Sequence, residues 1–426
     1  MKIAVLFGSL ALLILLSVPI GFAIGMSTVL TLIFFSDIPL VMVSQNAIAG
    51  VDSFPLMAIP FFVLAGQLMT SGGVARRLLD VAMALVGFVT GGLGMVATVA
   101  SMFFSAISGS SLATCSAISS FMIPAMIEKG YDDGLSAAIC ASAANIGVII
   151  PPSIPFVIYG VVTGTSIGDL FLAGIIPGIL MGLSIIVVVY LQAKKLGYKG
   201  TGKWEGFRHL LKTVNEAKWA LIAPLIVLGG IYGGIFTPTE AAVIAVVYSF
   251  IVGFFIYREL TLERIYQDLV ETATVNGIIT FMIGLSTAFA SFLSMEQIPS
   301  AIAQGLLGIT DNPILLLLLI NLFLLALGCI IDNIPATIIL SPILLPVVMK
   351  CGVDPITFGV VITANLAVGF VTPPYGPNLF VASAVSGVPM DRILKWIWPL
   401  VGAMFAVVLL ITYVPGATML LVNLFR

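Results

Sequence analysis

Long stretches of this chain contain no charged residue, and they limit what the chain can fold into. Most exceed the ~20 residues that an α-helix needs to cross a bilayer. Only 8% of the 426 residues are charged, against about a quarter in soluble domains. We therefore predict an integral membrane protein. The uncharged stretches are 3–36, 53–75, 81–127, 170–193, 220–239, 241–257, 355–390 and 396–425.

The fold class follows from the same stretches. Strands of a membrane barrel would alternate polar and apolar residues with a period of two, and these stretches do not. We expect an all-α polytopic membrane protein. A cleaved signal peptide is the alternative for the first residues, since Lys2 precedes an apolar run, but no Ala-x-Ala-like site follows and the run continues past Pro19.

Two segments, 110–177 and 332–399, align with each other at a fixed offset of 222 residues without a gap. In a membrane protein, paired segments interrupted by Gly and Pro point to a transport site in two inverted-topology repeats. We place the first repeat at 1–200 and the second at 219–426. The identical pairs are Pro124/Pro346, Gly130/Gly352, Asp132/Asp354, Gly147/Gly369, Pro151/Pro373, Pro152/Pro374, Pro155/Pro377, Asp169/Asp391 and Pro177/Pro399.

The densest basic segment lies between the repeats, within 194–218. The positive-inside rule makes this segment cytoplasmic, and we interpret 201–218 as a basic amphipathic connector. Opposite topology of the repeats requires an odd number of crossings in each, which puts both chain termini outside. Segments 38–48 and 260–270 have helical apolar spacing and are expected to be amphipathic helices on the membrane surface. Ordinary loop helices are the alternative.

The uncharged stretch 81–127 would be roughly 70 Å long as one helix, which no bilayer matches. It must break, and the Ser- and Gly-rich patch 105–111 is the place. The counterpart break is at 332–335. We predict a re-entrant helical hairpin in each repeat, at about 91–127 and 312–350, with a polar tip buried within protein.

The first repeat then contains a helix, at about 134–164, that two prolines interrupt. A proline has no amide hydrogen, so the carbonyl four residues earlier loses its helical partner. Pro151 would free the Gly147 carbonyl, and Pro152 would free that of Val148. Free carbonyls near mid-membrane are ligands for Na⁺ in transporters with discontinuous helices.

The second repeat has the same motif in its helix at about 355–386, where Pro373 would free the Gly369 carbonyl and Pro374 that of Phe370. The alternative is a Pro-kinked helix whose carbonyls are satisfied by Ser, Thr or water. Two copies at equivalent positions, each after a polar hairpin tip, favour the ion site.

The hairpin tips offer further ligands. Ser108, Ser110 and Ser111 supply hydroxyls and carbonyls where a half-helix begins, and the amides of such an N-terminus suit an anion. Asp332, the counterpart of Ser110, is a candidate functional carboxylate, although an ordinary N-cap ahead of Pro335 is the alternative. Other polar residues near the breaks are Thr114, Asn333, Asn365, Tyr375 and Asn378.

Several other classes fit poorly. The net charge of −2 predicts no nucleic-acid partner, and the single histidine, His209, argues against a His-based metal site or proton relay. The four cysteines have no C-x-x-C spacing. An intramembrane serine protease using Ser110 or Ser111 lacks a Lys or His base in the uncharged stretches. An ion channel is the closer alternative, because broken helices also line pores.

Five segments of the chain have distinctive motifs: SGSSLATCSAI, ANIGVIIPPSIPFVIYG, GGIFTPTEAAVIAVVYS, DNIPATIILSPILLP and NLAVGFVTPPYGPNLFVAS. With these motifs the chain resembles, over essentially its whole length, the large, DctM-like membrane subunit of tripartite ATP-independent periplasmic (TRAP) transporters. The resemblance implies Na⁺-driven uptake of an organic acid anion across the bacterial inner membrane by an elevator mechanism. It implies no enzyme activity and no cofactor. It also implies two partners, a separate small four-helix membrane subunit and a periplasmic substrate-binding protein.

Carried over by position, the resemblance implies two sodium sites. The substrate stays open among C4-dicarboxylates, sialic acids and sugar acids. The first sodium site would comprise Ser108, Ser110, Gly147, Ile150 and Pro152, and the second Gly328, Asp332, Gly369, Thr372 and Pro374. The predicted substrate-binding residues are Ser111, Thr114, Asn333, Tyr375 and Asn378.

Overall fold

The computed structural model describes residues 2–200, 204–299, 305, 308, 310 and 312–425, and these contain helices but no strand. Within that part of the chain, eight helices are long and apolar enough to cross a membrane. The predicted all-α polytopic membrane protein is confirmed. The eight helices are Phe54–Ser71, Ser111–Glu128, Ile167–Leu196, Phe207–Tyr232, Pro238–Ile256, Leu262–Met295, Asn333–Lys350 and Met390–Tyr413.

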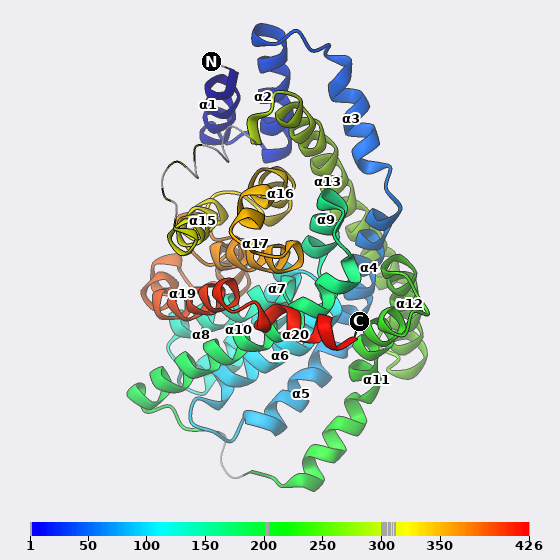
Figure 1. Cartoon of the computed structure of the whole chain (residues 1–426). Helices are drawn as coiled ribbons and strands as arrows, with labels where there is room; N and C mark the ends of the chain where they lie inside the picture. Colours follow the sequence, from blue (N-terminus) through cyan, green and yellow to red (C-terminus); the bar gives the residue numbers. More distant parts are fainter. Residues whose placement is uncertain are drawn as a thin grey trace.

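The first half of the chain folds into ten α-helices and two short 3₁₀ helices, η1 and η2, before the basic connector (Figure 1). They are α1 Lys2–Leu15, α2 Ile20–Phe35, α3 Val41–Val51, η1 Phe54–Met57, α4 Ala58–Ser71, α5 Val74–Val86, α6 Gly92–Ser108, α7 Ser111–Glu128, α8 Asp133–Ala144, η2 Asn145–Val148, α9 Ile154–Thr163 and α10 Ile167–Leu196.

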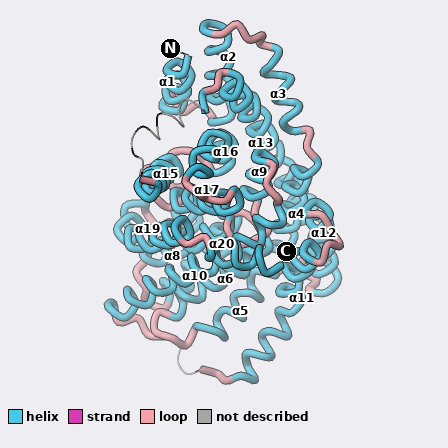
Figure 2. The backbone as a smooth tube through the Cα atoms, in the orientation of Figure 1, coloured by secondary structure: helices cyan, strands magenta, loops and turns pink. Residues whose placement is uncertain are grey.

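The second half is also built of helices (Figure 2). The described ones are α11 Phe207–Tyr232, α12 Pro238–Ile251 with its continuation η3 Val252–Ile256, α13 Leu262–Met295, α15 Pro313–Gly328, α16 Asn333–Lys350, α17 Pro355–Gly369, α18 Pro377–Ser386, α19 Met390–Tyr413 and α20 Gly416–Phe425.

The helix boundaries follow the sequence offset. Helices α7 and α16 are 222 residues apart at both ends, and α8 and α17 begin 222 residues apart. The repeated residues shape these boundaries. Asp132 and Asp354 are the N-caps of α8 and α17, and the turns before them contain Gly130 and Gly352 with φ of 83° and 81°, a conformation that favours glycine. The inverted orientation of the halves stays a prediction.

Each predicted hairpin is a pair of contacting helices, α6 with α7 and α15 with α16. The first pair is separated by Gly109 and Ser110. Gly109 has φ of 61°, and its amide closes α6 by donating to the Ser105 carbonyl. The second pair is separated by residues 329–332. That the hairpins enter and leave the membrane on the same side stays a prediction.

In each half, the helix that follows the prolines packs against the hairpin of the other half. Helix α9, which follows the prolines of the first half, packs against α16 of the second hairpin. Helix α18, which follows the prolines of the second half, packs against α7 of the first hairpin. Each hairpin therefore packs against a helix of the opposite half as well as against helices of its own half.

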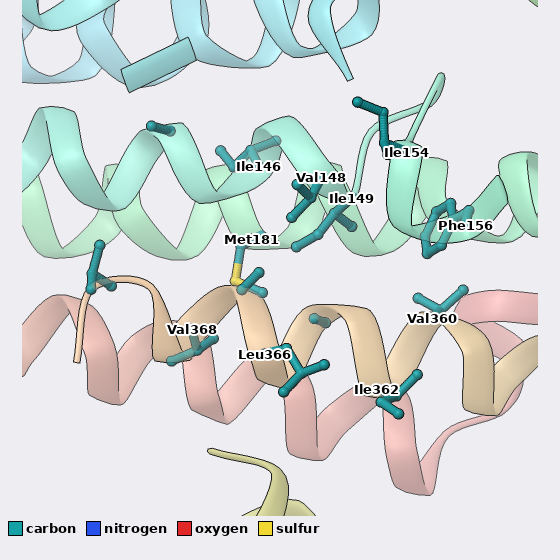
Figure 3. Close-up of a cluster of buried hydrophobic side chains, with 14 of the residues drawn as sticks. Ile146, Val148, Ile149, Ile154, Phe156, Met181, Val360, Ile362, Leu366 and Val368 are labelled. Atoms are coloured by element: carbon teal, nitrogen blue, oxygen red, sulfur yellow. The ribbon is translucent and has the colours of Figure 1, made fainter. Parts of the chain in front are cut away.

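The centre of the molecule is an apolar core that joins the two interrupted helices. Figure 3 shows Ile146, Val148 and Ile149 of the first half next to α17, which carries Leu366 and Val368. All five residues are buried. Dispersion and hydrophobic burial of this kind fix the two interrupted helices relative to each other.

Helices α2, α3 and α4 pack along one long helix, α13, which also contacts α16 (Figure 1). Residues 262–270 of the predicted surface helix at 260–270 are the first part of α13, which continues to Met295. The position of this segment at the membrane surface stays a prediction. In the first half the equivalent segment is divided, since α3 ends at Val51 and η1 begins at Phe54.

Most of the predicted connector, 201–218, is part of a longer helix. Residues 201–203 lie outside the described residues. From Phe207 the chain forms α11, which continues through the basic segment to Tyr232 without a break.

Candidate functional site: a cavity between the two hairpin tips

A cavity of about 390 Å³ lies between the two hairpin tips on one side and helices α4 and α13 on the other. The tips contribute the segments 108–113 and 332–334. The opposite wall is mostly apolar and includes Val63 of α4 and Val275 of α13. Both predicted tips therefore meet at one cavity, which the sequence offset alone does not require.

The first tip is held together by hydroxyl groups. The Ser108 Oγ lies 2.9 Å from the Thr114 Oγ1, and Thr114 Oγ1 donates to the Ser110 carbonyl at 2.8 Å. The Ser110 side chain caps α7 by accepting from the Ala113 amide at 3.3 Å. Capping by serine satisfies one of the free amides at a helix start. Two hydroxyl oxygens and one carbonyl oxygen are thereby brought together at the first tip.

Gly147 brings the interrupted helix against this tip. A Cβ atom at this position would lie 2.7 Å from the Ser110 carbonyl oxygen and 2.8 Å from Thr114 Oγ1, closer than real Cβ contacts. The Gly147 carbonyl accepts no hydrogen bond from a described residue. Next to it, the Pro152 carbonyl oxygen approaches Gly109, 2.7 Å from the Cβ position of that glycine. Carbonyl and hydroxyl oxygens are the ligands of hard cations.

The second tip has the same construction with a carboxylate. The Asp332 Oδ1 accepts from the Ile334 amide at 3.4 Å and so caps α16. The backbones of Gly328 and Gly369 touch, since a Cβ on Gly369 would lie 2.5 Å from the Gly328 carbonyl oxygen. Thr372 donates its hydroxyl to the Val368 carbonyl at 2.8 Å.

Three of the four carbonyls expected to be free are paired. The Ser153 hydroxyl donates to the Val148 carbonyl at 2.6 Å, and the Asn378 amide donates to the Phe370 carbonyl at 3.1 Å. The Gly369 carbonyl accepts from the Thr372 amide at 3.0 Å. The expectation was wrong for these three. Donors after the prolines replace the missing helical amide for Val148 and Phe370, and the amide one residue before Pro373 replaces it for Gly369. Only the Gly147 carbonyl remains as predicted.

The remaining residues of the predicted sodium sites are placed as follows. Ile150 packs against Gly178 of α10, with its Cγ1 2.3 Å from the Cβ position of that glycine. Pro374 follows Pro373 in the turn between α17 and α18, and the Tyr375 amide after it donates to the Cys329 carbonyl at 3.3 Å. The interrupted helix of the second half is thus joined to the hairpin of the same half. The first half has the corresponding contact, between Pro152 and Gly109.

The predicted substrate-binding residues separate into two groups. Ser111 and Asn333 line the cavity. Thr114 is buried behind the first tip. Asn378 is buried as well, and its Nδ2 donates to Ser111 Oγ at 2.6 Å and to Asn145 Oδ1 at 2.7 Å. Tyr375 is half exposed and lies against Phe380, away from the cavity lining.

Another polar residue from the sequence, Asn365, lies away from the cavity. Its Nδ2 donates to Asn321 Oδ1 at 2.6 Å. Asn321 in turn bonds Thr412 of α19 at 3.2 Å. This buried group belongs to the packing of α15, α17 and α19.

Sequence reasoning missed the polar groups of the opposite wall, Gln67 and Thr70 of α4 and Glu271 of α13. Gly66 on the same face of α4 lets that helix approach the first tip, since its Cβ position is 3.2 Å from Ser108 Cα. These residues belong to no repeated motif. The signal that could have found Gln67 and Thr70 is their position on one face of an otherwise apolar helix, three residues apart.

The charge of the cavity wall is unusual for an anion site. Its described lining includes the carboxylates Asp332 and Glu271 and no Lys, Arg or His. The positive ends of the wall are the N-termini of α7 and α16, whose first residues, Ser111 and Asn333, both line the cavity. A helix N-terminus carries about half a positive charge.

Interrupted helices around a cavity within a polytopic helical protein are the architecture of membrane transporters and channels. Its sequence matches, over residues 7–417, the family described as tripartite ATP-independent periplasmic transporter, DctM component. The chain belongs to this family, as the sequence motifs predict.

Three relatives illustrate the similarity. The isethionate TRAP transporter permease protein DctMQ of Oleidesulfovibrio alaskensis is 47% identical over 97% of this chain, which spans 65% of that relative's length. The sialic acid TRAP transporter large permease protein SiaM of Vibrio cholerae is 40% identical, over 99% of this chain and 98% of SiaM. The C4-dicarboxylate TRAP transporter large permease protein DctM of Pseudomonas aeruginosa is 39% identical, over 94% of each chain.

Among solved structures, the YdaH transporter of Alcanivorax borkumensis has a similar fold. The TM-score is 0.64, over 88% of this chain and 87% of YdaH, at 13% sequence identity. This likeness concerns the fold alone.

Proposed function

We propose that this chain is the large membrane subunit of a Na⁺-coupled secondary transporter that takes up an organic acid anion across the bacterial inner membrane. Its partners are a small four-helix membrane subunit and a periplasmic substrate-binding protein, which delivers the substrate. The observation that carries the proposal is the cavity between the tips, where two helix N-termini and two groups of oxygen ligands converge.

The first tip supports a Na⁺ site best. Na⁺ needs several oxygens, and the Gly147 carbonyl, which has no donor among the described residues, is a ready ligand. Ser108 Oγ and the Ser110 carbonyl belong to the tip against which the Gly147 backbone packs. At the second tip, Asp332 supplies the negative charge that the first tip lacks. In this proposal Na⁺ is a cargo that enters with the substrate.

The anion would bind at the N-termini of α7 and α16. With no basic side chain in the described lining, the amides and dipoles of these helices would bind the acid group, and bound Na⁺ would add positive charge next to it. This coupling makes anion binding dependent on Na⁺, which is the requirement of a symporter.

The acid group of the substrate can be a carboxylate or a sulfonate. Relatives of this chain are named for isethionate, sialic acid and C4-dicarboxylates. All three share an acid group that suits helix N-termini, and isethionate is thereby added to the classes expected from the sequence.

We also propose that transport follows an elevator mechanism. The hairpins and interrupted helices would form the moving body, and α2, α3, α4, α12 and α13 would form the stationary one. The cavity lies between these two groups of helices, which is where such movement exposes a substrate to one side at a time.

Uptake into proteoliposomes tests the proposal. The chain, the small subunit and the binding protein would be assayed with radiolabelled isethionate, sialic acid and succinate. We expect uptake of one of them that requires an inward Na⁺ gradient and the binding protein. Uptake that is unchanged when K⁺ replaces Na⁺ would refute Na⁺ coupling, and large passive Na⁺ conductance would indicate the channel instead.

A further inference from the structure

A second groove, of about 480 Å³, lies far from the cavity, on the surface between α10 and α19. It is formed where the C-terminal end of α10 passes the first turns of α19. Its walls are mostly apolar, with two lysines and a tryptophan at one end. It is lined by Val188, Leu191, Gln192, Lys195, Leu196, Lys395, Trp396 and Pro399.

The charged end of the groove has no partner within the described chain. None of the ion pairs between described residues involves Lys195 or Lys395. The Lys395 ammonium lies 5.5 Å from the centroid of the Trp396 ring, and the two lysines belong to different helices. Two unpaired positive charges beside an apolar wall are complementary to an amphiphile with an anionic head.

The side chain of Gln192 supplies a third polar group of the groove, and its oxygen also has no partner in the described part of the chain. The Oε1 atom of Gln192 is buried and has no hydrogen-bond donor among the described residues. A buried acceptor without a donor costs about 1–3 kcal/mol. Gln192 also lines the groove, three residues from Lys195 on one face of α10, so a rotation of its side-chain amide would turn this acceptor toward a ligand held by Lys195.

The location agrees with a lipid headgroup. Lys194 and Lys195 form the last turn of α10, at the start of the basic connector that the positive-inside rule makes cytoplasmic. Tryptophan and lysine at a helix end are typical of the membrane interface. Basic pockets between membrane helices on the cytoplasmic side bind anionic phospholipids.

We propose that this groove binds phosphatidylglycerol from the cytoplasmic leaflet. The phosphate would lie between Lys195 and Lys395, and an acyl chain would follow Val188 and Leu191. A hydroxyl of the glycerol headgroup would donate to Gln192 Oε1. A phosphocholine headgroup has no hydroxyl to donate and carries a positive charge toward the lysines.

Native mass spectrometry of the full chain in detergent tests this site. The chain would be titrated with phosphatidylglycerol, phosphatidylcholine and inorganic phosphate. We expect a defined phosphatidylglycerol adduct, and a loss of roughly 10- to 30-fold in its apparent affinity in the double variant Lys195→Ala/Lys395→Ala. Lys194→Ala is the matched control, because Lys194 is next in sequence and does not line the groove.

A second variant tests the headgroup. Gln192→Leu removes the acceptor and should weaken phosphatidylglycerol while leaving phosphatidic acid, which has no glycerol headgroup, unchanged. Equal binding of phosphatidylglycerol and phosphatidylcholine, or an unchanged double variant with a normal melting temperature, would overturn the proposal. So would competition by inorganic phosphate alone, or displacement of the lipid when the small membrane subunit is added.

Discussion

At the residue scale, Gly147 explains why a glycine recurs in the interrupted helix. Its missing side chain allows the helix backbone to reach the first hairpin tip, and a Cβ atom would approach Ser110 and Thr114 to within 2.8 Å. The repeated glycine thus permits a close backbone approach in both halves, at Gly147 to the first tip and at Gly369 to Gly328. Of these two glycines, Gly147 has a carbonyl with no donor among the described residues, whereas the Gly369 carbonyl accepts from the Thr372 amide.

Gly147→Ala tests this contact. Inserting a methyl group into a packed site costs about 1–3 kcal/mol, and here it would displace the tip. We expect Na⁺-dependent uptake to fall about tenfold or more, as measured in proteoliposomes, with the protein still folded. Gly402→Ala in α19 is the control, because nothing lies within 4 Å of its Cβ position. Equal uptake in the two variants would show that the contact is not needed.

Asp332 has two roles that a single substitution separates. Asparagine caps a helix as well as aspartate does, so Asp332→Asn should keep the melting temperature. We expect it to raise the Na⁺ concentration for half-maximal uptake about tenfold or more, because a charged ligand is lost.

The control for this variant is Asp354→Asn. Asp354 caps α17 by accepting from the Ile356 amide at 2.8 Å, and it does not line the cavity. If both variants keep the Na⁺ dependence of the natural chain, Asp332 is an N-cap only.

At the scale of elements, the N-terminal helix is tied to the far end of α13. The Lys2 ammonium lies 2.9 Å from Glu296 Oε1, and the Ser36 hydroxyl donates to the same oxygen at 3.1 Å. The bond from Lys2, followed by that from Ser36, lowers the pKa of Glu296 below its usual value. One carboxylate thus connects α1, the end of α2 and the end of α13.

This tie should depend on pH in a predictable direction. Because the pKa of Glu296 is lowered by folding, its stabilising contribution is complete above the unfolded value of about 4.3 and is lost as the pH falls further. We expect amide hydrogen exchange in α1, corrected for the intrinsic rate, to increase below pH ~4.3.

The variant Glu296→Gln distinguishes the contribution of Glu296 to the pH dependence from the contributions of other carboxylates. It should show faster exchange in α1 already at neutral pH, with little further change on acidification. A pH profile identical to that of the natural chain would assign the effect to another group.

The positions of most elements could be predicted from the sequence, and the reasons are local. The hairpin breaks follow from an uncharged stretch too long for one helix and from small polar residues at 105–111. The continuity of α13 could not be predicted, because 260–270 has the same apolar period as a surface helix. The segment after it contains Asn276 and Gly277, so the sequence does not indicate that the helix continues to Met295.

Only part of the candidate site could be predicted, because some of its contacts are local in sequence and others depend on the tertiary structure. Its repeated Gly, Pro and Asp residues act on their own backbone, so their effect can be inferred from sequence. The partners of the freed carbonyls depend on tertiary position, as for the Ser153 hydroxyl and the Asn378 amide. The α4 and α13 wall with Glu271 is formed by segments that carry no repeated motif.

At the scale of the whole molecule, the exchange of partners between the halves predicts how the chain assembles. Neither hairpin is complete without the other half, because α9 packs on α16 and α18 packs on α7. We therefore expect a chain cut between Gly197 and Gly206 to assemble when both halves are coexpressed. Each half alone should be degraded or aggregate, since its exposed apolar surface has no partner.

Copurification with a tag on one half measures this assembly. A second cut within the α7–α8 turn, at Lys129, is the control, because it divides a half internally and should prevent assembly. Recovery of a stable, monodisperse first half on its own would contradict the expectation.

The same exchange constrains how cargo can move. A hairpin that shifted alone would have to leave the post-proline helix of the opposite half, breaking the α9–α16 or the α18–α7 interface. Under the proposed mechanism, the two hairpins and their ion sites would therefore move together as one rigid body. We therefore expect a fixed ratio of Na⁺ ions to substrate in each transport cycle. When only one of the two ion sites is occupied, the protein should not complete the cycle.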